Sequence, residues 1–334
     1  MGIPDVRVGI IGTGYAAKQR LTALLADGRV TVVGVAGRQR QRVETLTEGC
    51  GATAFIGAEA LLKVPDLDLV FICGVNQAHA ECVQQALELG RHVVVEYPLA
   101  LDLEQALFLI NYARSRQRLL HVEHIELLSG VQTLLRQHIP KLGEVFAIHY
   151  TTITATRPAP DRWTYQTELF GFPLLGAVSR LHRLIDLWGA VQSVYCQVRY
   201  HGAEMPRRFR SCHCVAQLQF ANGIPATVVY GKGESFWRSQ RTLDVQGSLG
   251  GLFVDDDIAT LVQGTEAQPL DTGSRLGLFA LDTQMVLDHL FEQKPLYVQP
   301  EQLVHTLAVA WAAQRSAETG QTMGIDGVTV VPVG

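Results

Sequence analysis

The sequence predicts an α/β protein whose N-terminal part forms a parallel sheet and whose C-terminal α+β part forms a large, mostly antiparallel sheet. Up to residue 123, short apolar runs alternate with segments of helical period, as in a parallel sheet covered by helices on both faces. From Gly143 onward, successive strand-like runs lack intervening helices, which favours antiparallel pairing. We therefore expect two domains, at residues 1–123 and 124–334.

The elements of the first domain are expected to alternate along the chain. Strands are predicted at residues 7–11, 30–35, 52–55, 69–73, 92–96 and 119–123. Helices are predicted from Ala17 to Leu25, from Gln39 to Glu48, from Gln77 to Leu89 and after Asp102, a typical N-cap residue. In the second domain, strands are predicted at residues 144–155, 191–200, 211–220, 226–230 and 241–246, and helices at 174–188 and 301–318. This order predicts a doubly wound sheet in the first domain only.

Length and composition exclude several classes of protein. The 334 residues correspond to about two domains, and 47% apolar against 18% charged residues indicates a globular fold. The net charge of −4, without a basic tail, argues against a nucleic-acid partner. No apolar run approaches the length of a membrane span and the N-terminus carries no secretion signal, so neither membrane insertion nor secretion is expected. Six cysteines in 334 residues are too sparse for a disulfide framework and fit a reducing cytoplasm better.

A glycine-rich turn follows the first predicted strand and opens the first predicted helix. Its pattern is Gly12-x-Gly14-x-x-Ala17, with Thr13 and Tyr15 at intervening positions. Such glycines permit a tight turn and let backbone N–H groups approach a pyrophosphate at the helix N-terminus. The strand–turn–helix context makes the pattern specific, so we expect a Rossmann dinucleotide-binding domain. A turn that serves chain reversal alone is the alternative.

The residues after the second predicted strand indicate which nicotinamide cofactor binds. An NAD-preferring site usually places Asp or Glu there, to accept a hydrogen bond from the ribose 2′-hydroxyl. Here the sequence is Gly37-Arg38-Gln39-Arg40, without an acidic residue. Because the guanidinium of Arg38 suits a 2′-phosphate, NADPH is favoured over NADH, which stays possible. A solvated loop cation is the other interpretation of Arg38.

Four segments of the chain occur in the order typical of one enzyme family. They are Gly12-Thr13-Gly14, Ile72-Cys73-Gly74-Val75-Asn76-Gln77-Ala78-His79, Glu96-Tyr97-Pro98 and Gly247-Ser248-Leu249-Gly250-Gly251-Leu252. Over essentially its whole length the chain resembles the glucose-fructose oxidoreductase/inositol dehydrogenase family. The resemblance implies a Rossmann domain followed by an open, mostly antiparallel sheet. It also implies that Cys73, Glu96 and Tyr97 bind the cofactor, with Glu96 at the nicotinamide ribose.

The chain departs from that family at the acid–base residues. Tyr97 stands where typical members have lysine, and alignment on Leu184-Ile185-Asp186 places Ser179 and Arg183 where they have aspartate and histidine. Tyrosine and arginine, with pKa values of about 10 and above about 12, do not serve readily as bases at neutral pH. Oxidation of a sugar alcohol is therefore not expected.

Three longer segments account for these departures together. They are Val93–Leu99, His121–Leu128, and Phe170–Pro173 leading to Val178–Leu181, and they resemble the biliverdin-IXα-reducing branch of the family. The resemblance implies that NAD(P)H reduces biliverdin to bilirubin by hydride transfer to the central methine carbon, while a proton reaches a pyrrole nitrogen. This reaction abstracts no hydroxyl proton, which fits the replacement of the lysine by Tyr97.

The same resemblance assigns catalytic roles to Arg180 and Tyr97. Arg180 is expected to assist protonation of the substrate, with solvent as the ultimate source because guanidinium is a poor acid. Tyr97 is expected beside the nicotinamide, as a packing wall and hydroxyl donor. The alternative for Arg180 is a surface arginine or a propionate anchor.

Other clusters are interpreted as structural or stay open. Cys212 and Cys214 share one face of a predicted strand that His213 does not share, and their spacing is unlike a zinc site, so no metal is expected. His121 and His124 are expected to fix the junction between the domains through hydrogen bonds. Two further groups could either contact a tetrapyrrole or stabilise the fold. The first is a basic loop with Arg207, Arg208 and Arg210, and the second is a group of aromatic residues, Trp163, Tyr165, Phe170 and Phe172.

Two other functions stay open. One is an NADP-dependent sugar or dihydrodiol oxidoreductase of the same family, and the other is a regulator that senses NADP without catalysis. The oligomeric state also stays open.

Overall fold

The chain forms two compact units that alternate along the sequence. The computed structural model describes residues 6–202, 208–274 and 276–333. One unit comprises residues 1–125 and 276–300, and the other comprises residues 126–275 and 301–334. Two domains at 1–123 and 124–334 were predicted, and that prediction did not include the return of the chain to the first unit at residue 276.

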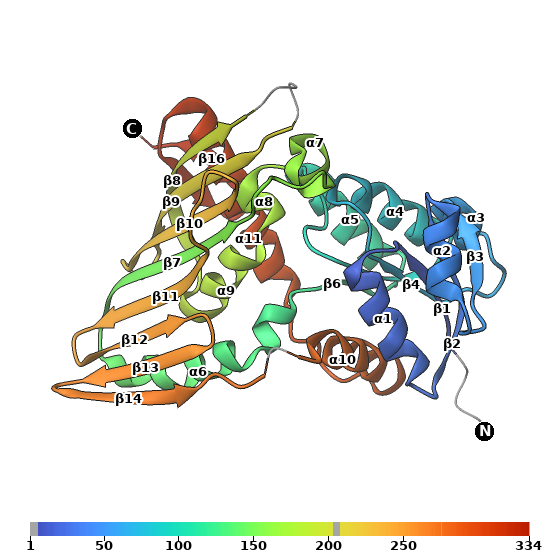
Figure 1. The fold of residues 1–334 in the computed structure, drawn as a ribbon, viewed down its shortest axis with the longest axis horizontal. Helices are drawn as coiled ribbons and strands as arrows, with labels where there is room; N and C mark the ends of the chain where they lie inside the picture. The colour runs from blue at the N-terminus through green and yellow to red at the C-terminus, as the bar shows by residue number, and fades with distance from the viewer. Residues whose placement is uncertain (1–5, 203–207, 275, 334) are drawn as a thin grey trace. The chain divides into compact units, whose positions relative to one another are not determined.

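The first unit is built on a parallel sheet with the strand order β3-β2-β1-β4-β5-β6 (Figure 1). Its strands are β1 (Val6–Ile11), β2 (Val30–Gly37), β3 (Thr53–Ile56), β4 (Leu69–Ile72), β5 (His92–Val95) and β6 (Leu120–Val122). Its helices are α1 (Tyr15–Leu25), α2 (Arg40–Thr47), α3 (Ala58–Leu62), α4 (Asn76–Glu88), α5 (Leu103–Ser115) and α10 (Leu278–Glu292). This is the doubly wound order of a dinucleotide-binding fold, as the sequence predicted.

Local sequence explains most of this unit. Every residue of β4 is buried, as expected for a parallel strand covered on both faces. Asp102 caps α5 as predicted, because its carboxylate accepts a hydrogen bond from the N–H of Gln105 at 2.9 Å. Helix α10 was not predicted, and its Val286 and Leu287 belong to the same apolar core as β1 and α1.

The second unit is built on a long sheet with the order β14-β13-β12-β11-β7-β10-β9-β8-β15-β16 (Figure 1). Its strands are β7 (Val145–Ala155), β8 (Val191–His201), β9 (Ser211–Phe220), β10 (Pro225–Gly233), β11 (Gln240–Gly247), β12 (Gly250–Asp255), β13 (Ile258–Gln263), β14 (Glu266–Asp271), β15 (Met323–Asp326) and β16 (Thr329–Pro332). Its helices are η1 (Ile125–Leu128), α6 (Gly130–His138), η2 (Ile139–Leu142), η3 (Trp163–Tyr165), α7 (Thr167–Phe170), α8 (Pro173–Gly176), α9 (Ser179–Trp188) and α11 (Pro300–Thr319). The sheet is antiparallel apart from the parallel pair β7 and β10, which confirms the predicted fold class.

Burial alternates along the strands of the second sheet. On β9, Cys212 and Cys214 are buried whereas His213 and Gln217 are exposed. One face, here called the covered face, is therefore packed against the rest of the unit, and the other face meets solvent. The two cysteines share the covered face, as predicted.

The second unit also differs from the predicted elements. Strands β12 to β16 were not predicted, and the helix expected at 174–188 is divided into α8 and α9. The division falls after Gly176, where a Cβ atom would come within 2.5 Å of the Phe170 ring. The helix is therefore interrupted where the chain packs against an aromatic side chain.

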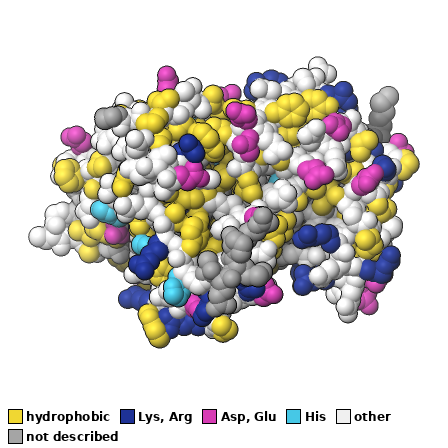
Figure 2. Space-filling view, turned by 90° about the horizontal axis from the view of Figure 1, so that it is seen from above, with side chains coloured by type: hydrophobic (Ala, Val, Ile, Leu, Met, Phe, Trp, Pro, Cys, Tyr) yellow, Lys and Arg dark blue, Asp and Glu magenta, His cyan; other side chains and the backbone are white. Residues whose placement is uncertain are grey.

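No described helix is both long and apolar enough to span a membrane. Acidic and basic side chains are interspersed over the face of the molecule shown in Figure 2. This distribution agrees with the small net charge of −4.

Candidate functional site

The glycine turn lies between β1 and α1, and its two glycines meet different surroundings. Gly12 has φ +133°, and a Cβ atom there would lie 2.4 Å from the carbonyl oxygen of Cys73. Gly14 is the N-cap of α1 with φ −86°, and no protein atom lies within 4 Å of the position of its missing Cβ. The fold itself requires the first glycine, whereas the second leaves open space above the helix N-terminus.

The N-terminus of α1 suits an anionic ligand. No side chain caps the helix, and its first turn contains no acidic residue. The first N–H groups of a helix have no partner within the helix and carry a partial positive charge. Ala17 is fully buried beneath the turn, and Tyr15 is exposed and meets the ring of Phe279 edge-on at 5.9 Å. The turn therefore fits the phosphates of a dinucleotide.

The end of β2 lies against this turn. A Cβ atom on Gly37 would come within 2.8 Å of the methyl groups of Thr13 and Val43, so close packing requires glycine there. Arg38 follows and is exposed. Within the described residues, no carboxylate forms an ion pair with Arg38. Its guanidinium thus suits the 2′-phosphate of NADPH.

Three further candidates follow β4 and β5. Because the carboxyl ends of parallel strands meet at one edge of the sheet, Cys73, Glu96 and Tyr97 lie at the same edge as Gly12. The thiol of Cys73 lies 4.0 Å from Oε1 of Glu96, and burial together with the charge of Glu96 raises the pKa of Cys73. The ring of Tyr97 stacks on His124, with centroids 5.4 Å apart and planes 12° apart.

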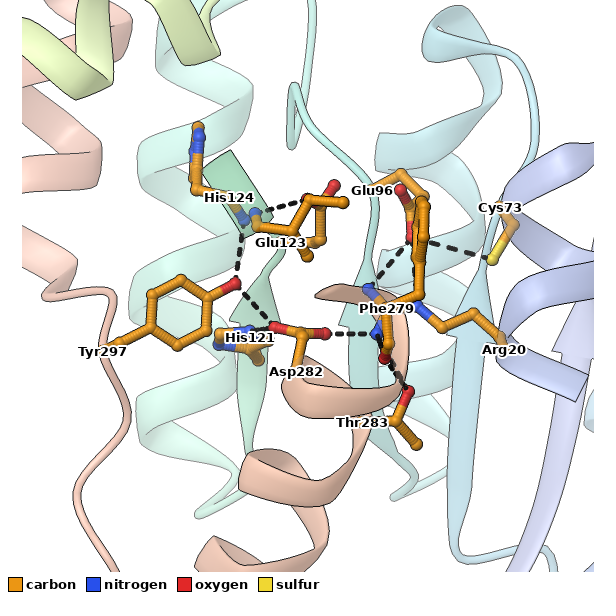
Figure 3. A network of polar contacts seen from close by, with 11 residues as sticks. Arg20, Cys73, Glu96, His121, Glu123, His124, Phe279, Asp282, Thr283 and Tyr297 are labelled. Atoms are coloured by element: carbon orange, nitrogen blue, oxygen red, sulfur yellow. Dashed lines mark hydrogen bonds and ion pairs between the residues drawn. The ribbon is translucent and has the colours of Figure 1, made fainter. Parts of the chain in front are cut away.

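A buried polar network lies beneath this edge (Figure 3). Arg20 is fully buried and donates hydrogen bonds to Glu96 at 3.2 Å, to Oγ1 of Thr283 at 3.0 Å, and to the carboxylate of Asp282. Figure 3 shows Asp282 between Arg20 on one side and His121 and Tyr297 on the other. The network therefore connects α1, the end of β5 and α10.

Asp282 is fully satisfied within this network. Nε2 of His121 lies 2.8 Å from its Oδ1, and the hydroxyl of Tyr297 donates to the same oxygen at 2.6 Å. Burial alone would raise the pKa of Asp282, but Arg20 and His121 hold it well below its usual range. The ionised carboxylate thus neutralises the buried guanidinium together with Glu96. His121 serves hydrogen bonding, as predicted, but within the first unit.

Glu123 adds a second buried carboxyl group beside Glu96. It is 1% exposed and accepts a hydrogen bond from the N–H of Ile125 at 2.6 Å. Burial, the negative charge of Glu96 and a hydrogen bond between the two carboxyl groups raise the pKa of Glu123 well above its usual range. Glu123 therefore keeps its proton to a higher pH than an ordinary glutamate does.

Sequence reasoning missed Arg20 and Asp282. A signal was present for Arg20, because it stands on the apolar face of α1 between Ala17 and Leu24, where a charged residue is unusual. No comparable signal marked Asp282, whose helix was not predicted.

Arg180 lies in the first turn of α9, in the second unit. Its Nη1 donates to Oγ of Ser179 at 2.8 Å and lies 3.4 Å from Oε1 of Glu126. Its side chain is 16% exposed. The contacts hold the guanidinium in place while part of it stays accessible.

Arg183 is more tightly held than Arg180. It donates to the carbonyl oxygen of Glu126 at 3.1 Å, to Oγ of Ser129 at 3.2 Å and to the hydroxyl of Tyr150 at 3.3 Å. It thus ties α9 to the η1 region and to β7, a structural function rather than that of a base.

The other clusters are placed as follows. Arg208 pairs with Asp161 at 2.9 Å and Arg210 pairs with Glu234 at 2.5 Å, whereas Arg207 lies outside the described residues. The described chain contains no group of three or more His, Cys, Asp or Glu side chains arranged to hold a metal ion. Tyr165 and Phe170 are buried in the second unit, and Tyr165 packs in a cluster with Phe209.

Comparison with protein-family models agrees with this geometry. Residues 6–124 match the GFO/IDH/MocA model described as oxidoreductase family, NAD-binding Rossmann fold. Residues 136–325 match its companion model, described as oxidoreductase family, C-terminal alpha/beta domain. The two matches together cover most of the chain.

Similar proteins include reductases of two kinds. The crystal structure of biliverdin reductase in complex with biliverdin and NADP+ from Synechocystis sp. PCC 6803 is 43% identical, covers 94% of this chain and 99% of its own, and has a TM-score of 0.92. Biliverdin reductase A of Mus musculus is 26% identical over 78% of this chain and 79% of its own length. The dTDP-3,4-didehydro-2,6-dideoxy-alpha-D-glucose 3-reductase of Streptomyces antibioticus is 30% identical over 76% of this chain and 77% of its own length.

Proposed function

The chain belongs to the GFO/IDH/MocA oxidoreductase family, and we propose that within this family it is an NADPH-dependent reductase that converts biliverdin to bilirubin. The observation that carries the proposal is its similarity, over nearly its whole length, to the Synechocystis reductase bound to biliverdin and NADP+. The chain is thus an NAD(P)-dependent oxidoreductase. Its cytoplasmic location stays a prediction from the sequence.

The residues at the edge of the first sheet fit NADPH. The turn at Gly12 and Gly14 and the N-terminus of α1 would hold the pyrophosphate, and Arg38 would bind the 2′-phosphate. Cys73, Glu96 and Tyr97 would lie at the nicotinamide half. When bound, NADPH supplies the hydride that reduces the central methine carbon.

Tyr97 suits a reduction that requires no catalytic base. A phenol with a pKa of about 10 stays protonated at neutral pH, so it can donate a hydrogen bond but cannot readily remove a proton from an alcohol. Biliverdin reduction needs no such base, since a proton must be added to a pyrrole nitrogen. Tyr97, stacked on His124, would form a rigid wall beside the nicotinamide.

Arg180 is proposed to assist the protonation of biliverdin. Its guanidinium stays charged at any accessible pH, and its contacts with Ser179 and Glu126 restrict its orientation. A fixed positive charge stabilises the negative charge that develops as hydride arrives, without reorganisation during the reaction. Arg180 therefore acts electrostatically rather than as the acid itself.

Reduction of a ketosugar nucleotide is the second candidate. The similarity to the Streptomyces antibioticus 3-reductase favours it. Against it stands the replacement of the family's acid–base residues by Tyr97, Ser179 and Arg183. A sensor that binds NADP without catalysis is the remaining alternative.

The proposal is tested by mixing purified protein with biliverdin and NADPH and following bilirubin absorbance. We expect turnover in the wild type and a decrease in kcat of about 10²-fold in Arg180→Ala, the usual effect of removing a group that stabilises transition-state charge. The Kd for NADPH should not change.

Arg136→Ala is the matched control, because Arg136 lies in the same unit, pairs with Asp186 at 2.7 Å and is half exposed. It should retain wild-type kcat. Absence of bilirubin at every pH between 5 and 9 would exclude the proposed function. Turnover of a ketosugar nucleotide in its place would support the second candidate.

A further inference from the structure

Lys232 is a buried lysine in the second unit. It is the penultimate residue of β10, and its residue is 6% exposed. Its ammonium group donates a hydrogen bond to the carbonyl oxygen of Thr164. Across the described part of the chain, no Asp or Glu forms an ion pair with it. Buried lysines are rare unless they are paired, so this position requires an explanation.

Aromatic rings surround the ammonium group. Nζ lies 3.6 Å from the ring centroid of Phe170, 5.0 Å from that of Tyr165, 5.4 Å from that of Phe209 and 5.9 Å from that of Tyr230. Cation–π attraction offsets part of the desolvation cost. It does not replace water or a carboxylate, so the charged form stays destabilised.

The charged and titratable neighbours of Lys232 do not offset the destabilisation of its charged form. Burial lowers the pKa of Lys232 to about 8, against an opposing effect of the Cys212 thiol on β9 and with a further lowering by the positive charge of Arg180 on α9. Burial raises the pKa of Tyr165 above its usual value, so this phenol stays neutral. Lys232 is thus expected to lose its proton near pH 8, and the positive charge of Arg180 contributes to this lowered pKa.

Lys232 also stands where the covered face of the second sheet opens to solvent. It pairs in register with Thr154 on β7, so the two side chains lie on the same face. Thr152, one position earlier on this face, is buried, whereas Thr154 is exposed. Arg241 on β11 pairs with Thr152 and is exposed on this face too. A ligand that reaches Thr154 therefore lies next to Lys232.

We propose that Lys232 is the acid that delivers the proton to the pyrrole nitrogen of biliverdin, while Arg180 beside it stabilises the developing negative charge. The inference rests on the proposed function. Hydride forms the new C–H bond at the methine carbon, and the displaced electron pair moves to the nitrogen. An N–H bond of the ammonium breaks, an N–H bond of the pyrrole forms, and solvent reprotonates the neutral amine.

The chemistry of the two cations favours this division of roles. The guanidinium of Arg180 holds its protons too tightly to act as an acid. An acid transfers its proton best when its pKa lies close to the working pH, and burial brings Lys232 into that range. The alternative role, an anchor for a propionate carboxylate, requires only positive charge.

Lys232→Arg separates these roles, because arginine keeps the charge but not the acidity. For the wild type, we expect kcat to fall above pH about 8 as the ammonium loses its proton. In Lys232→Arg, kcat should decrease about 10²-fold, and the alkaline decrease should be absent up to pH 10. Lys232→Met should lower kcat similarly. Lys141→Arg, at an exposed lysine of the same unit, should behave as the wild type.

Three outcomes would overturn the assignment. If Lys232→Arg keeps the wild-type kcat and pH profile, Lys232 is not the acid. If Lys232→Met has a raised KM with unchanged kcat, Lys232 is an anchor for a propionate and again not the acid. If both variants fail to fold, a wild-type kcat that does not decrease between pH 7 and 10 decides against the proposal. Failure of the wild type to reduce biliverdin would instead refute the proposed function itself.

Discussion

At the scale of single residues, Gly12 and Gly14 are glycines for different physical reasons. Gly12 combines φ +133° with a backbone oxygen 2.4 Å from the place of its missing Cβ. Gly14 has an ordinary φ of −86° and nothing within 4 Å. A Cβ atom at Gly14 would meet no protein atom within 4 Å, so we expect the missing side chain to leave room for a ligand.

Gly14→Ala should leave stability unchanged and weaken NADPH binding. The added methyl group would occupy the space that the phosphates approach, so we expect the Kd for NADPH to rise at least about tenfold, or about 1.4 kcal/mol. Fluorescence titration measures the Kd, and thermal unfolding measures stability. Gly28→Ala, at another position with nothing within 4 Å, is the control. Tight NADPH binding by Gly14→Ala would show that the phosphates bind elsewhere.

Glu123→Gln tests the buried carboxyl pair through pH. The native pKa of Glu123 is raised by burial and by Glu96, so the unfolded chain releases this proton at lower pH than the native state does. Glu123 therefore costs increasing stability as pH rises from about 4.3 toward its native pKa, at up to about 1.4 kcal/mol per pH unit.

Glu123→Gln removes that cost, so its stability relative to the wild type should increase with pH. Urea unfolding at pH 5, 6, 7 and 8 measures the difference. Glu104→Gln, at an exposed position in the first turn of α5, should show no such trend. A constant difference between Glu123→Gln and the wild type would mean that Glu123 is ionised in the native protein.

At the scale of elements, helix α10 is joined to the rest of the Rossmann unit by apolar packing and by the buried polar network around Asp282. Val286 and Leu287 contribute to the core around β1, and Asp282 neutralises Arg20 of α1. Both partners of this pair are fully buried. Removal of Asp282 leaves the buried guanidinium of Arg20 with Glu96 as its remaining carboxylate among the described residues. Removal of both Arg20 and Asp282 leaves no buried guanidinium to neutralise, although His121 and Tyr297 still lose their acceptor.

Asp282→Leu should therefore destabilise the protein by about 3–5 kcal/mol, and Arg20→Met/Asp282→Leu should recover part of that loss. Urea unfolding of both single variants, the double variant and the wild type gives the coupling energy. Lys294→Ala, which removes the pairs of a half-exposed lysine with Asp288 and Glu292, should cost less than about 1 kcal/mol. Additive single effects would show that the pair is not coupled.

The elements also differ in how well local sequence predicted them. The strands of the first unit and the cap at Asp102 were predicted because apolar period and capping residues act within a few positions. Helix α10 and strands β12 to β16 were missed. Strand β14 has no buried residue, so it lacks the buried apolar pattern that marked the earlier strands. Strand β13 has that pattern, with Ala259 and Leu261 buried, but only over six residues.

At the scale of the whole molecule, the chain forms two units, and no single boundary in the sequence divides them. The first unit ends at residue 125 and resumes at residue 276. Family models that match 6–124 and 136–325 follow sequence order. Only contacts in space assign residues 276–300 to the Rossmann sheet, because helix α10 carries no dinucleotide signature of its own.

The sequence by itself determined the fold class, the dinucleotide turn and the loss of the family's acid–base residues, because each depends on neighbouring residues or on residue type. It also predicted Arg38, Arg180 and Tyr97 as candidate site residues. Only the tertiary structure decided which charges are buried and which groups meet. Arg20 and Asp282 stand 262 positions apart, and Lys232 and Thr164 stand 68 apart. Desolvation and ion pairing depend on which side chains are close in space, and a local sequence pattern does not contain that information.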